Sequence, residues 1–240
     1  MKKLIKKIIF RQKADSESYV KYLKLKGMRI GNDVTIYDPK NVTIDETRPW
    51  MIEIGNHVRI TKNVTILTHG YDWSVKKTLD GEILGSSGKV TIGNNVFIGM
   101  QATILKGVTI GNNTIIGANS LVNKDFPDNS VVAGNPAKVI CNIDEYFSKR
   151  KKLQVDEAVE SCIEFFKTYS VWPKKNDMRE FICLFEDRTS NVDNNEVFTE
   201  IGSLCMNYEE TKKCFYNSKG EFKNYEEFLN YCKELYEKTI

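Results

Sequence analysis

From Ile92 to Val122 the chain reads IGNNVF IGMQAT ILKGVT IGNNTI IGANSL V, with an aliphatic residue at every sixth position and usually a glycine after it. A period of six fits neither a 3.6-residue helix nor a simple alternating strand. It indicates short strands joined by tight turns, so that three hexapeptides close one triangular coil. The predicted fold is a β-helix whose aliphatic side chains point inward and stack coil upon coil.

The same phrase occurs earlier in the chain, starting at Ile30 and again at Ile54. Twelve aliphatic positions then lie on the six-residue grid, namely Ile30, Ile36, Val42, Ile54, Ile60, Ile66, Ile92, Ile98, Ile104, Ile110, Ile116 and Val122. Asparagine tolerates positive φ and bonds its own backbone, so Asn94-Asn95 and Asn112-Asn113 suit the turns. Most of the repeat is expected to build a core and to carry no chemistry.

Composition limits the class of protein. The chain has 240 residues, of which 41% are hydrophobic, and its net charge is +3. No segment approaches the roughly 18 uninterrupted apolar residues of a spanning helix, and the first ten residues have too short an apolar stretch for a secretory signal. We expect a soluble cytoplasmic protein. The six cysteines lie outside the repeats without a Cys-x-x-Cys pair, which favours buried reduced thiols over a metal site or disulfides.

Three segments follow from the periodicity: an N-terminal helical segment over residues 1–27, the β-helix over 28–140, and a mainly helical domain over 141–240. Helical spacing from Asp15 to Lys26 ends at Gly27, a plausible helix stop. The grid is interrupted over 67–89, where we expect a loop that leaves one edge of the solenoid. Helical stripes near residues 155–166 and 225–236 predict two helices of the last domain.

The first residues are strongly basic. Over residues 2–9 the apolar side chains fall on one helical face and the lysines on the other. Such a helix suits an anionic membrane surface, and peripheral contact with a membrane is one hypothesis. The alternative is a helix that covers the open end of the solenoid. Binding to nucleic acid is not expected, because no recognition motif accompanies the lysines.

Only two histidines exist, and they differ in setting. His57 lies in an ordinary hexad, where a structural role is expected. His69 lies in the interruption, beside Gly70 and among aromatic and acidic residues. An imidazole there could accept a proton from a substrate hydroxyl if a neighbouring carboxylate fixes its tautomer. Asp72 and Glu82 are the carboxylates that this hypothesis assigns to that task.

The run from Ile92 to Val122 and the closing phrase Ala133-Gly134-Asn135-Pro136-Ala137-Lys138 closely resemble the hexapeptide-repeat acyltransferases. Within them the chain looks most like the sugar O-acetyltransferases of the galactoside, maltose and capsular-polysaccharide group. This resemblance implies a left-handed parallel β-helix, a homotrimer, and acetyl-CoA bound between neighbouring coils. It also implies that His69 is the general base for direct attack on the thioester, with Glu82 as its acidic partner and with no metal required.

For the coenzyme, the resemblance points to Met100, Ala118, Asn123, Lys124 and Lys138. Met100 and Ala118 would pair with the pantetheine amides through their backbones, and the two lysines would meet the phosphates as mobile point charges. On the acceptor side, Asn41 matches an asparagine of the acceptor pocket. Tyr71, Asp72 and Trp73 are residue types that stack on a sugar ring and bond its hydroxyls; an anchor onto an adjacent subunit is an equal interpretation of the aromatic pair.

Of three rival functions, one is excluded and two stay open. A γ-type carbonic anhydrase needs three histidine ligands for zinc, which two histidines cannot supply. A non-catalytic trimeric scaffold would need neither His69 nor Lys124 and Lys138. The long C-terminal domain favours this alternative, because a minimal acetyltransferase does without it. An N-acetyltransferase acting on an amino sugar would need much the same machinery as an O-acetyltransferase that acts on capsule, lipopolysaccharide or another glycan precursor.

Overall fold

The computed structural model describes residues 10–238. The chain divides into two compact units between Tyr146 and Phe147, and each unit is described by itself. The basic segment over residues 2–9, for which a membrane-facing helix was one hypothesis, lies outside the described residues. Within the described part, no helix is both long and apolar enough to cross a membrane.

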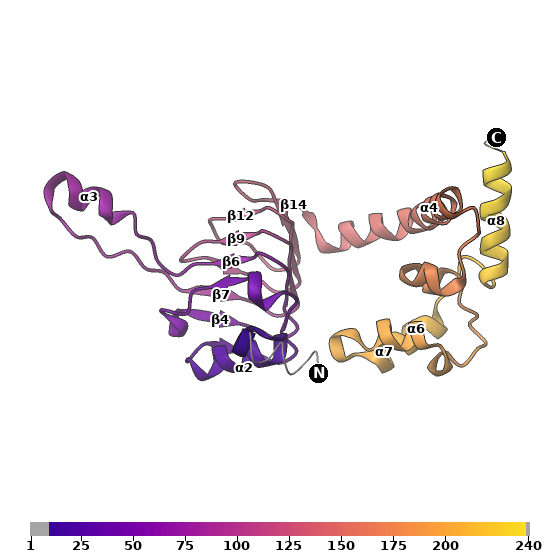
Figure 1. The fold of residues 1–240 in the computed structure, drawn as a ribbon, viewed down its shortest axis with the longest axis horizontal. Coiled ribbons are helices and arrows are strands. Elements are labelled where there is room, and N and C mark those ends of the chain that lie inside the picture. Colours follow the sequence, from indigo (N-terminus) through magenta and orange to yellow (C-terminus); the bar gives the residue numbers. More distant parts are fainter. Residues whose placement is uncertain (1–9, 239–240) are drawn as a thin grey trace. The chain divides into compact units, whose positions relative to one another are not determined.

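The first unit is a parallel β-helix with three sheets as its faces (Figure 1). Sheet 1 contains β1 (Arg29–Ile30), β4 (Ile52–Ile54), β7 (Val90–Ile92) and β10 (Thr109–Ile110). Sheet 2 contains β2 (Thr35–Ile36), β5 (Arg59–Ile60), β8 (Val96–Ile98), β11 (Thr114–Ile116), β13 (Ser130–Ala133) and β14 (Lys138–Asn142). Sheet 3 contains β3 (Thr43–Ile44), β6 (Thr65–Ile66), β9 (Thr103–Ile104) and β12 (Leu121–Val122). Among the strands of the described residues, β14 alone is antiparallel to its neighbour, β13.

The register of the strands reflects the six-residue grid. Thr91 pairs with Thr109, and Thr103 pairs with Leu121, so this coil advances by three hexapeptides. The first coils are longer because the chain inserts the short 3₁₀ helices η2 (Pro39–Asn41) and η3 (Pro49–Met51) between strands. The largest insertion, between β6 and β7, carries α3 (Trp73–Asp80). In Figure 1 this arm extends away from the coils.

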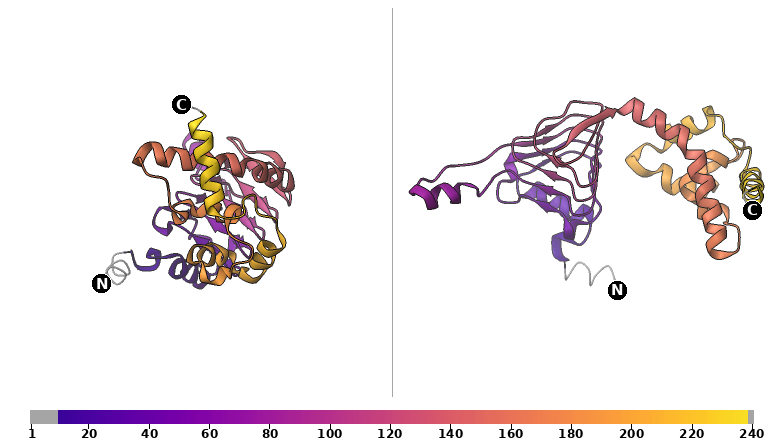
Figure 2. Two further views of the ribbon diagram at one scale, coloured as in Figure 1. Left: turned by 90° about the vertical axis from the view of Figure 1, so that its right-hand side faces the viewer. Right: turned by 90° about the horizontal axis from the view of Figure 1, so that it is seen from above.

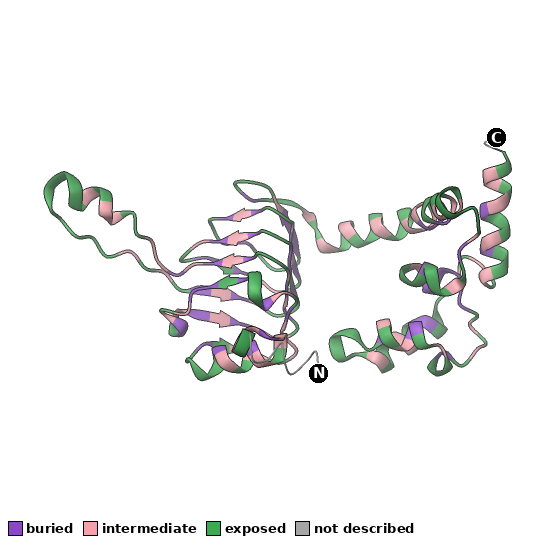
Figure 3. Cartoon of the chain, viewed as in Figure 1, coloured by how far each residue is buried: buried purple, intermediate pink, exposed green. Residues whose placement is uncertain are grey.

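The aliphatic grid positions form the core of the solenoid, as predicted. Eleven of the twelve are buried, and Ile30 of the first coil is partly buried against them. In the three-residue strands β4, β7, β8 and β11, buried positions alternate with more accessible ones (Figure 3), because successive side chains of a strand point to opposite faces. The turn residues Asn95 and Asn113 adopt positive φ, as the sequence indicated.

One substitution pair tests this packing. We expect Ile98→Ala to lower the free energy of unfolding by about 2–5 kcal/mol, because it removes a fully buried side chain from between stacked coils. Its neighbour Phe97 is 42% exposed, so Phe97→Ala should cost clearly less. Urea unfolding of the two variants makes the comparison, and equal losses would contradict the assigned direction of these side chains.

The start of the solenoid is covered by α2 (Ser16–Leu25), which follows the short 3₁₀ helix η1 (Arg11–Lys13). Asp15 caps α2, since its side chain accepts a hydrogen bond from the backbone N–H of Ser18 at 2.8 Å. Tyr19 and Leu23 on its inner face are fully buried in the same core as the coils. The helix predicted over Asp15 to Lys26 is therefore confirmed.

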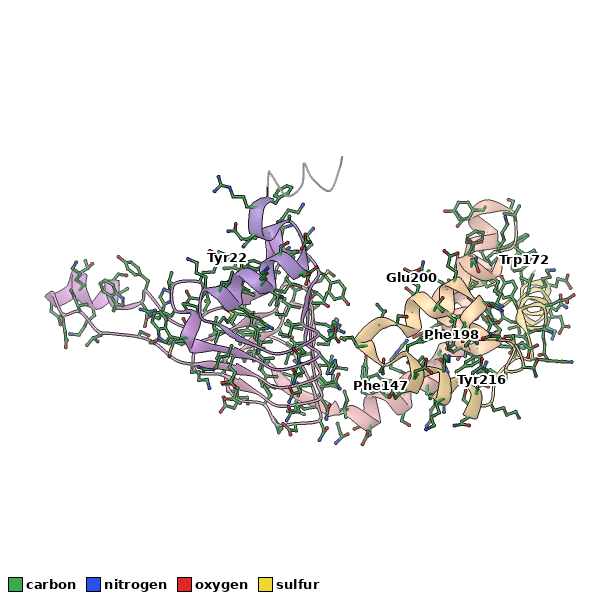
Figure 4. The ribbon with its side chains drawn as sticks, turned by 90° about the horizontal axis from the view of Figure 1, so that it is seen from below. Tyr22, Phe147, Trp172, Phe198, Glu200 and Tyr216 are labelled. Atoms are coloured by element: carbon green, nitrogen blue, oxygen red, sulfur yellow. The ribbon has the colours of Figure 1, made fainter. Side chains whose placement is uncertain are left out.

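The second unit is helical, as expected from its periodicity (Figure 2). Its α-helices are α4 (Ile143–Tyr169), which begins in the first unit, α5 (Ile182–Phe185), α6 (Glu196–Gly202), α7 (Tyr208–Asn217) and α8 (Tyr225–Glu237). The 3₁₀ helices between them are η4 (Lys175–Phe181), η5 (Val192–Asn194) and η6 (Leu204–Met206). Aromatic side chains such as Phe198 and Trp172, labelled in Figure 4, pack within this unit.

All six cysteines carry free thiols. Cys162 and Cys232 are fully buried in the core of the second unit, as the apolar surroundings suggested. The expectation of burial is wrong for Cys183, Cys205 and Cys214, which are exposed. Within residues 10–238, no group of three or more His, Cys, Asp or Glu side chains is arranged to hold a metal ion.

Candidate active site

The candidate site lies at one corner of the solenoid, where the strands of sheet 3 end. Because Ile44 pairs with Ile66, and Ile66 with Ile104, the residues that follow these strands lie above one another at the same corner. Asp45 follows β3, and Thr68 and His69 follow β6 in the next coil. We call Asp45, Thr68 and His69 the corner triad.

Hydrogen bonds hold the triad together. The Nδ1 atom of His69 lies 2.6 Å from Oδ2 of Asp45. The same carboxylate oxygen accepts hydrogen bonds from the backbone N–H and the hydroxyl of Thr68. The other oxygen, Oδ1, accepts bonds from the backbone N–H of Thr47 at 3.0 Å and from its hydroxyl at 2.6 Å. Both oxygens of Asp45 are thus engaged by donors from two successive coils.

The electrostatics of the site follow from this arrangement. Burial by itself would raise the pKa of Asp45, whose side chain is only 4% exposed. The hydrogen bonds from Thr47, Thr68 and His69 outweigh burial and hold the pKa of Asp45 well below its ordinary value. The carboxylate is therefore ionised at neutral pH and can only accept hydrogen bonds. Nδ1 of a neutral His69 must then carry the proton, which leaves Nε2 with a free lone pair.

The low pKa of Asp45 predicts how stability depends on pH. Its ionised form contributes stability that is fully present above the pKa of an unfolded aspartate, about 4, and that is lost as the pH falls toward the depressed pKa of the folded state. We expect Asp45→Asn to be less stable than wild type at pH 7 and the difference to shrink below about pH 4. Urea unfolding at a series of pH values measures this. A constant difference over that range would contradict the assignment.

The carboxylate that contacts His69 was not the one predicted. Glu82 lies on the arm, 55% exposed, and its carboxylate is 3.0 Å from the amine of Lys76. Asp72 directly precedes α3 and is exposed. No hydrogen bond or ion pair in the structure joins either carboxylate to His69. The hypothesis that Asp72 or Glu82 fixes the tautomer is corrected by the contact with Asp45, which comes from the coil below.

The arm begins and ends beside the triad. Its two chain segments are joined at the base. There the backbone N–H of Gly88 donates to the Thr68 carbonyl at 2.9 Å, and Ser87 and His69 form an isolated antiparallel β-bridge. On the arm, the rings of Tyr71 and Trp73 meet edge to face with centroids 4.7 Å apart. No residue of α3 is buried. The structure therefore places both aromatic candidates in the segment that directly follows His69.

The predicted coenzyme positions fall into two groups, at the two ends of the sheet 3 strands. Met100 and Ala118 lie at the corner that precedes these strands, where the backbone N–H of Asn119, the residue after Ala118, donates to the Met100 carbonyl at 2.8 Å. Lys138 of β14 pairs with Ala133, the last residue of the sheet 2 strand β13. Asn123 and Lys124 directly follow β12, above the corner triad. All five of these residues are exposed.

Asn41, predicted to line the acceptor pocket, does not lie with the triad. It ends η2, and its side-chain amide donates to the carboxylate of Asp38 at 2.7 Å. From Asn41 the chain passes through β3 before it reaches Asp45, so the two residues lie at opposite ends of that strand.

His57 has the structural setting expected for it. Its Nδ1 atom lies 2.9 Å from Asp33, and this carboxylate also pairs with Arg59 at 2.6 Å. Sequence reasoning missed Asp45, Thr47 and Thr68. A second break in the grid, between Ile44 and Ile52, was the signal that could have drawn attention to Asp45.

Comparisons with known proteins agree with this architecture. A family model described as bacterial transferase hexapeptide (six repeats) matches residues 89–124. Protein CapG of Staphylococcus aureus is 38% identical over 175 residues, which cover 70% of this chain and 97% of CapG. The galactoside O-acetyltransferase of Escherichia coli is 41% identical over 118 residues, which cover 48% of this chain and 56% of that protein. A solved acetyltransferase of Vibrio cholerae in complex with acetyl coenzyme A is 31% identical, covers 48% of this chain and 60% of its own, and has a TM-score of 0.41.

Proposed function

Because the chain belongs to the hexapeptide-repeat acetyltransferases of the galactoside and maltose group, we propose that it transfers acetyl from acetyl-CoA to a sugar hydroxyl. The acceptor belongs to a glycan precursor, such as a building block of capsule or lipopolysaccharide. An O-acetyltransferase is favoured over an N-acetyltransferase because two relatives that are named for a galactoside are O-acetyltransferases.

The observation that carries this proposal is the contact between His69 Nδ1 and the ionised carboxylate of Asp45. It leaves Nε2 as the basic nitrogen, and the side chain of His69 is 35% exposed, so an acceptor can reach it. The His57–Asp33 pair differs from this one, because the carboxylate of Asp33 also pairs with Arg59. His69 instead lies at the base of the arm, and among the described residues its carboxylate has no basic partner besides the imidazole. The geometry therefore favours a catalytic site over a scaffold.

In the proposed reaction, Nε2 of His69 takes the proton from the acceptor hydroxyl as its oxygen attacks the thioester carbonyl. The carbon–sulfur bond then breaks, and the proton on His69 passes to the departing thiolate of coenzyme A. Asp45 stabilises the imidazolium that exists between these two transfers. General-base assistance of this kind is worth about 10²–10⁴-fold in rate. No covalent acyl-enzyme forms, and no cysteine takes part.

We assign the coenzyme to the exposed face of sheet 3 and the corners that flank it. Its pantetheine would contact Met100 and Ala118, and its phosphates would meet Lys124 and Lys138, with Asn123 next to Lys124. Met100, Ala118, Asn123 and Lys124 support the assignment because they are exposed and lie at the two ends of the sheet 3 strands β9 and β12. The acceptor sugar would stack on Tyr71 and Trp73, with Asp72 accepting from its hydroxyls.

The assembly that we propose is a homotrimer, in which a neighbouring copy completes the coenzyme site. The long exposed arm supports this, because its apolar side chains, Val75, Leu79, Ile83 and Leu84, have no cover in the single chain. We further propose that the enzyme works in the cytoplasm or at the inner face of a membrane, where glycan precursors are made.

One experiment tests the proposed function. Purified protein is incubated with acetyl-CoA and a panel of sugars, nucleotide sugars and amino sugars; released thiol is measured, and the acceptor is analysed by mass spectrometry. We expect thiol release that depends on a hydroxyl-bearing sugar and one added acetyl group on it. Absence of both turnover and acetyl-CoA binding would favour the scaffold instead. Acetylation confined to amino groups would favour the N-acetyltransferase.

A further inference from the structure

The residue next to Asp45 is held by two tyrosines from a distant part of the chain. The hydroxyl of Tyr19 donates to Oε1 of Glu46, and the hydroxyl of Tyr22 donates to Oε2, both at 2.9 Å. Both tyrosines belong to α2, which covers the first coil; Tyr22 is labelled on this helix in Figure 4. Each carboxylate oxygen of Glu46 therefore has its own phenol donor.

The two tyrosines are themselves firmly placed. Tyr19 is fully buried, and its ring stacks on that of Tyr22 with centroids 6.3 Å apart. The amine of Lys13 lies 4.9 Å from the centre of the Tyr19 ring and donates to the Val42 carbonyl at 3.1 Å. At the start of the helix, Ser16 accepts a hydrogen bond from the backbone N–H of Ile36 at 2.8 Å. The donors that meet Glu46 thus come from a helix that is tied to the first coil at several points.

Holding Glu46 restricts Asp45. Glu46 is the central residue of the turn in which Thr47 donates its N–H and its hydroxyl to Oδ1 of Asp45. A rotation of the backbone at Glu46 would move Asp45 and Thr47 relative to each other. The contact of Oδ2 with His69 requires the carboxylate to keep one orientation, because Thr68 engages that oxygen as well. Anchoring the side chain of Glu46 limits this rotation.

We propose that Tyr19 and Tyr22 are positioning residues for catalysis, acting through Glu46 to fix the carboxylate of Asp45 that orients His69. The link to catalysis rests on the function proposed above, whereas the effect on the orientation of His69 does not. In addition to covering the core, α2 thereby helps to position the carboxylate of Asp45. Neither tyrosine touches His69, so each acts only through the turn at Glu46.

Kinetics provide the first test. Tyr22→Phe, which keeps the ring and removes the donor, should lower kcat about tenfold and leave the KM for acetyl-CoA unchanged. In an Asp45→Asn background the same change should have no further effect, because residues of one network are not additive. A matched control is Tyr208→Phe in the second unit, which removes a phenol donor that lies 2.7 Å from the carboxylate of Asp193. This control should leave kcat unchanged.

Nuclear magnetic resonance provides a second test that needs no activity. In protein labelled with ¹⁵N-histidine only two imidazoles give signals, and His57, which is bonded to Asp33, serves as an internal reference. Tyr19→Phe and Tyr22→Phe should each shift the ring resonances of His69 and leave those of His57 unchanged.

The outcomes separate this inference from the proposed function. Unchanged His69 resonances in both variants would overturn the inference, and so would a loss of kcat that is as large in the Asp45→Asn background as in wild type. A protein that transfers no acetyl but shows the selective shift of His69 would refute the proposed function and retain the positioning of His69.

Discussion

Replacing His69 with alanine is expected to lower kcat for acetyl transfer by about 10²–10⁴-fold, the range that a general base contributes. The physical reason is that Nε2 is the atom that removes the proton from the acceptor hydroxyl, and Nδ1 is already bonded to Asp45. Binding of acetyl-CoA should change little, because the proposed coenzyme contacts lie elsewhere. Initial rates of thiol release, together with calorimetric titration of acetyl-CoA, make the measurement.

His57→Ala is the matched control for this substitution. His57 also lies within hydrogen-bonding distance of an aspartate, yet it lies at a different corner and we propose no reaction there. Its loss should leave kcat unchanged. Turnover by His69→Ala at the wild-type rate would remove the general base from the mechanism.

Asp45→Asn is expected to lower kcat by about 10²–10⁴-fold as well, with little change in the KM for acetyl-CoA. An asparagine amide can donate to Nδ1 of His69, which favours the tautomer with the proton on Nε2, and that tautomer cannot act as a base. The charge that stabilises the imidazolium is lost too. Steady-state kinetics with a saturating acceptor measure the effect.

Two other variants separate this role from a general effect of removing acidic residues. Asp33→Asn takes the carboxylate from His57 instead, and Glu82→Gln neutralises the residue that the sequence suggested as the acidic partner. Neither should lower kcat appreciably. A loss of kcat in Glu82→Gln comparable to that in Asp45→Asn would contradict the site described here.

Much of the fold could be predicted because the core of a solenoid is built from a short sequence period that repeats along the chain. Ile92 and Ile98 are each one residue of a six-residue period, and their burial requires only the neighbouring coils. The left-handed parallel β-helix, with an N-terminal helix and a mainly helical C-terminal extension, is confirmed by the strand pairing together with the family match. The helices α4 and α8 were predictable for the same reason, since each buries a periodic apolar stripe.

The carboxylate of the site could not be predicted in the same way. Asp45 and His69 are 24 positions apart in the chain and meet only because β3 and β6 are paired. That register depends on the extra residues around η2 and η3, which disturb the six-residue count before the second coil. Glu82 is nearer to His69 in sequence, but the arm carries it away from the corner and pairs it with Lys76.

The tautomer of His69 in the free wild-type protein is the most direct test of the catalytic assignment. Nitrogen-15 shifts and couplings of the labelled imidazole at neutral pH distinguish a proton on Nδ1 from one on Nε2. The contact with ionised Asp45 predicts that the neutral ring carries its proton on Nδ1 and that Asp45→Asn changes this state. A neutral ring with its proton on Nε2 in wild type would contradict the assignment of His69 as the base.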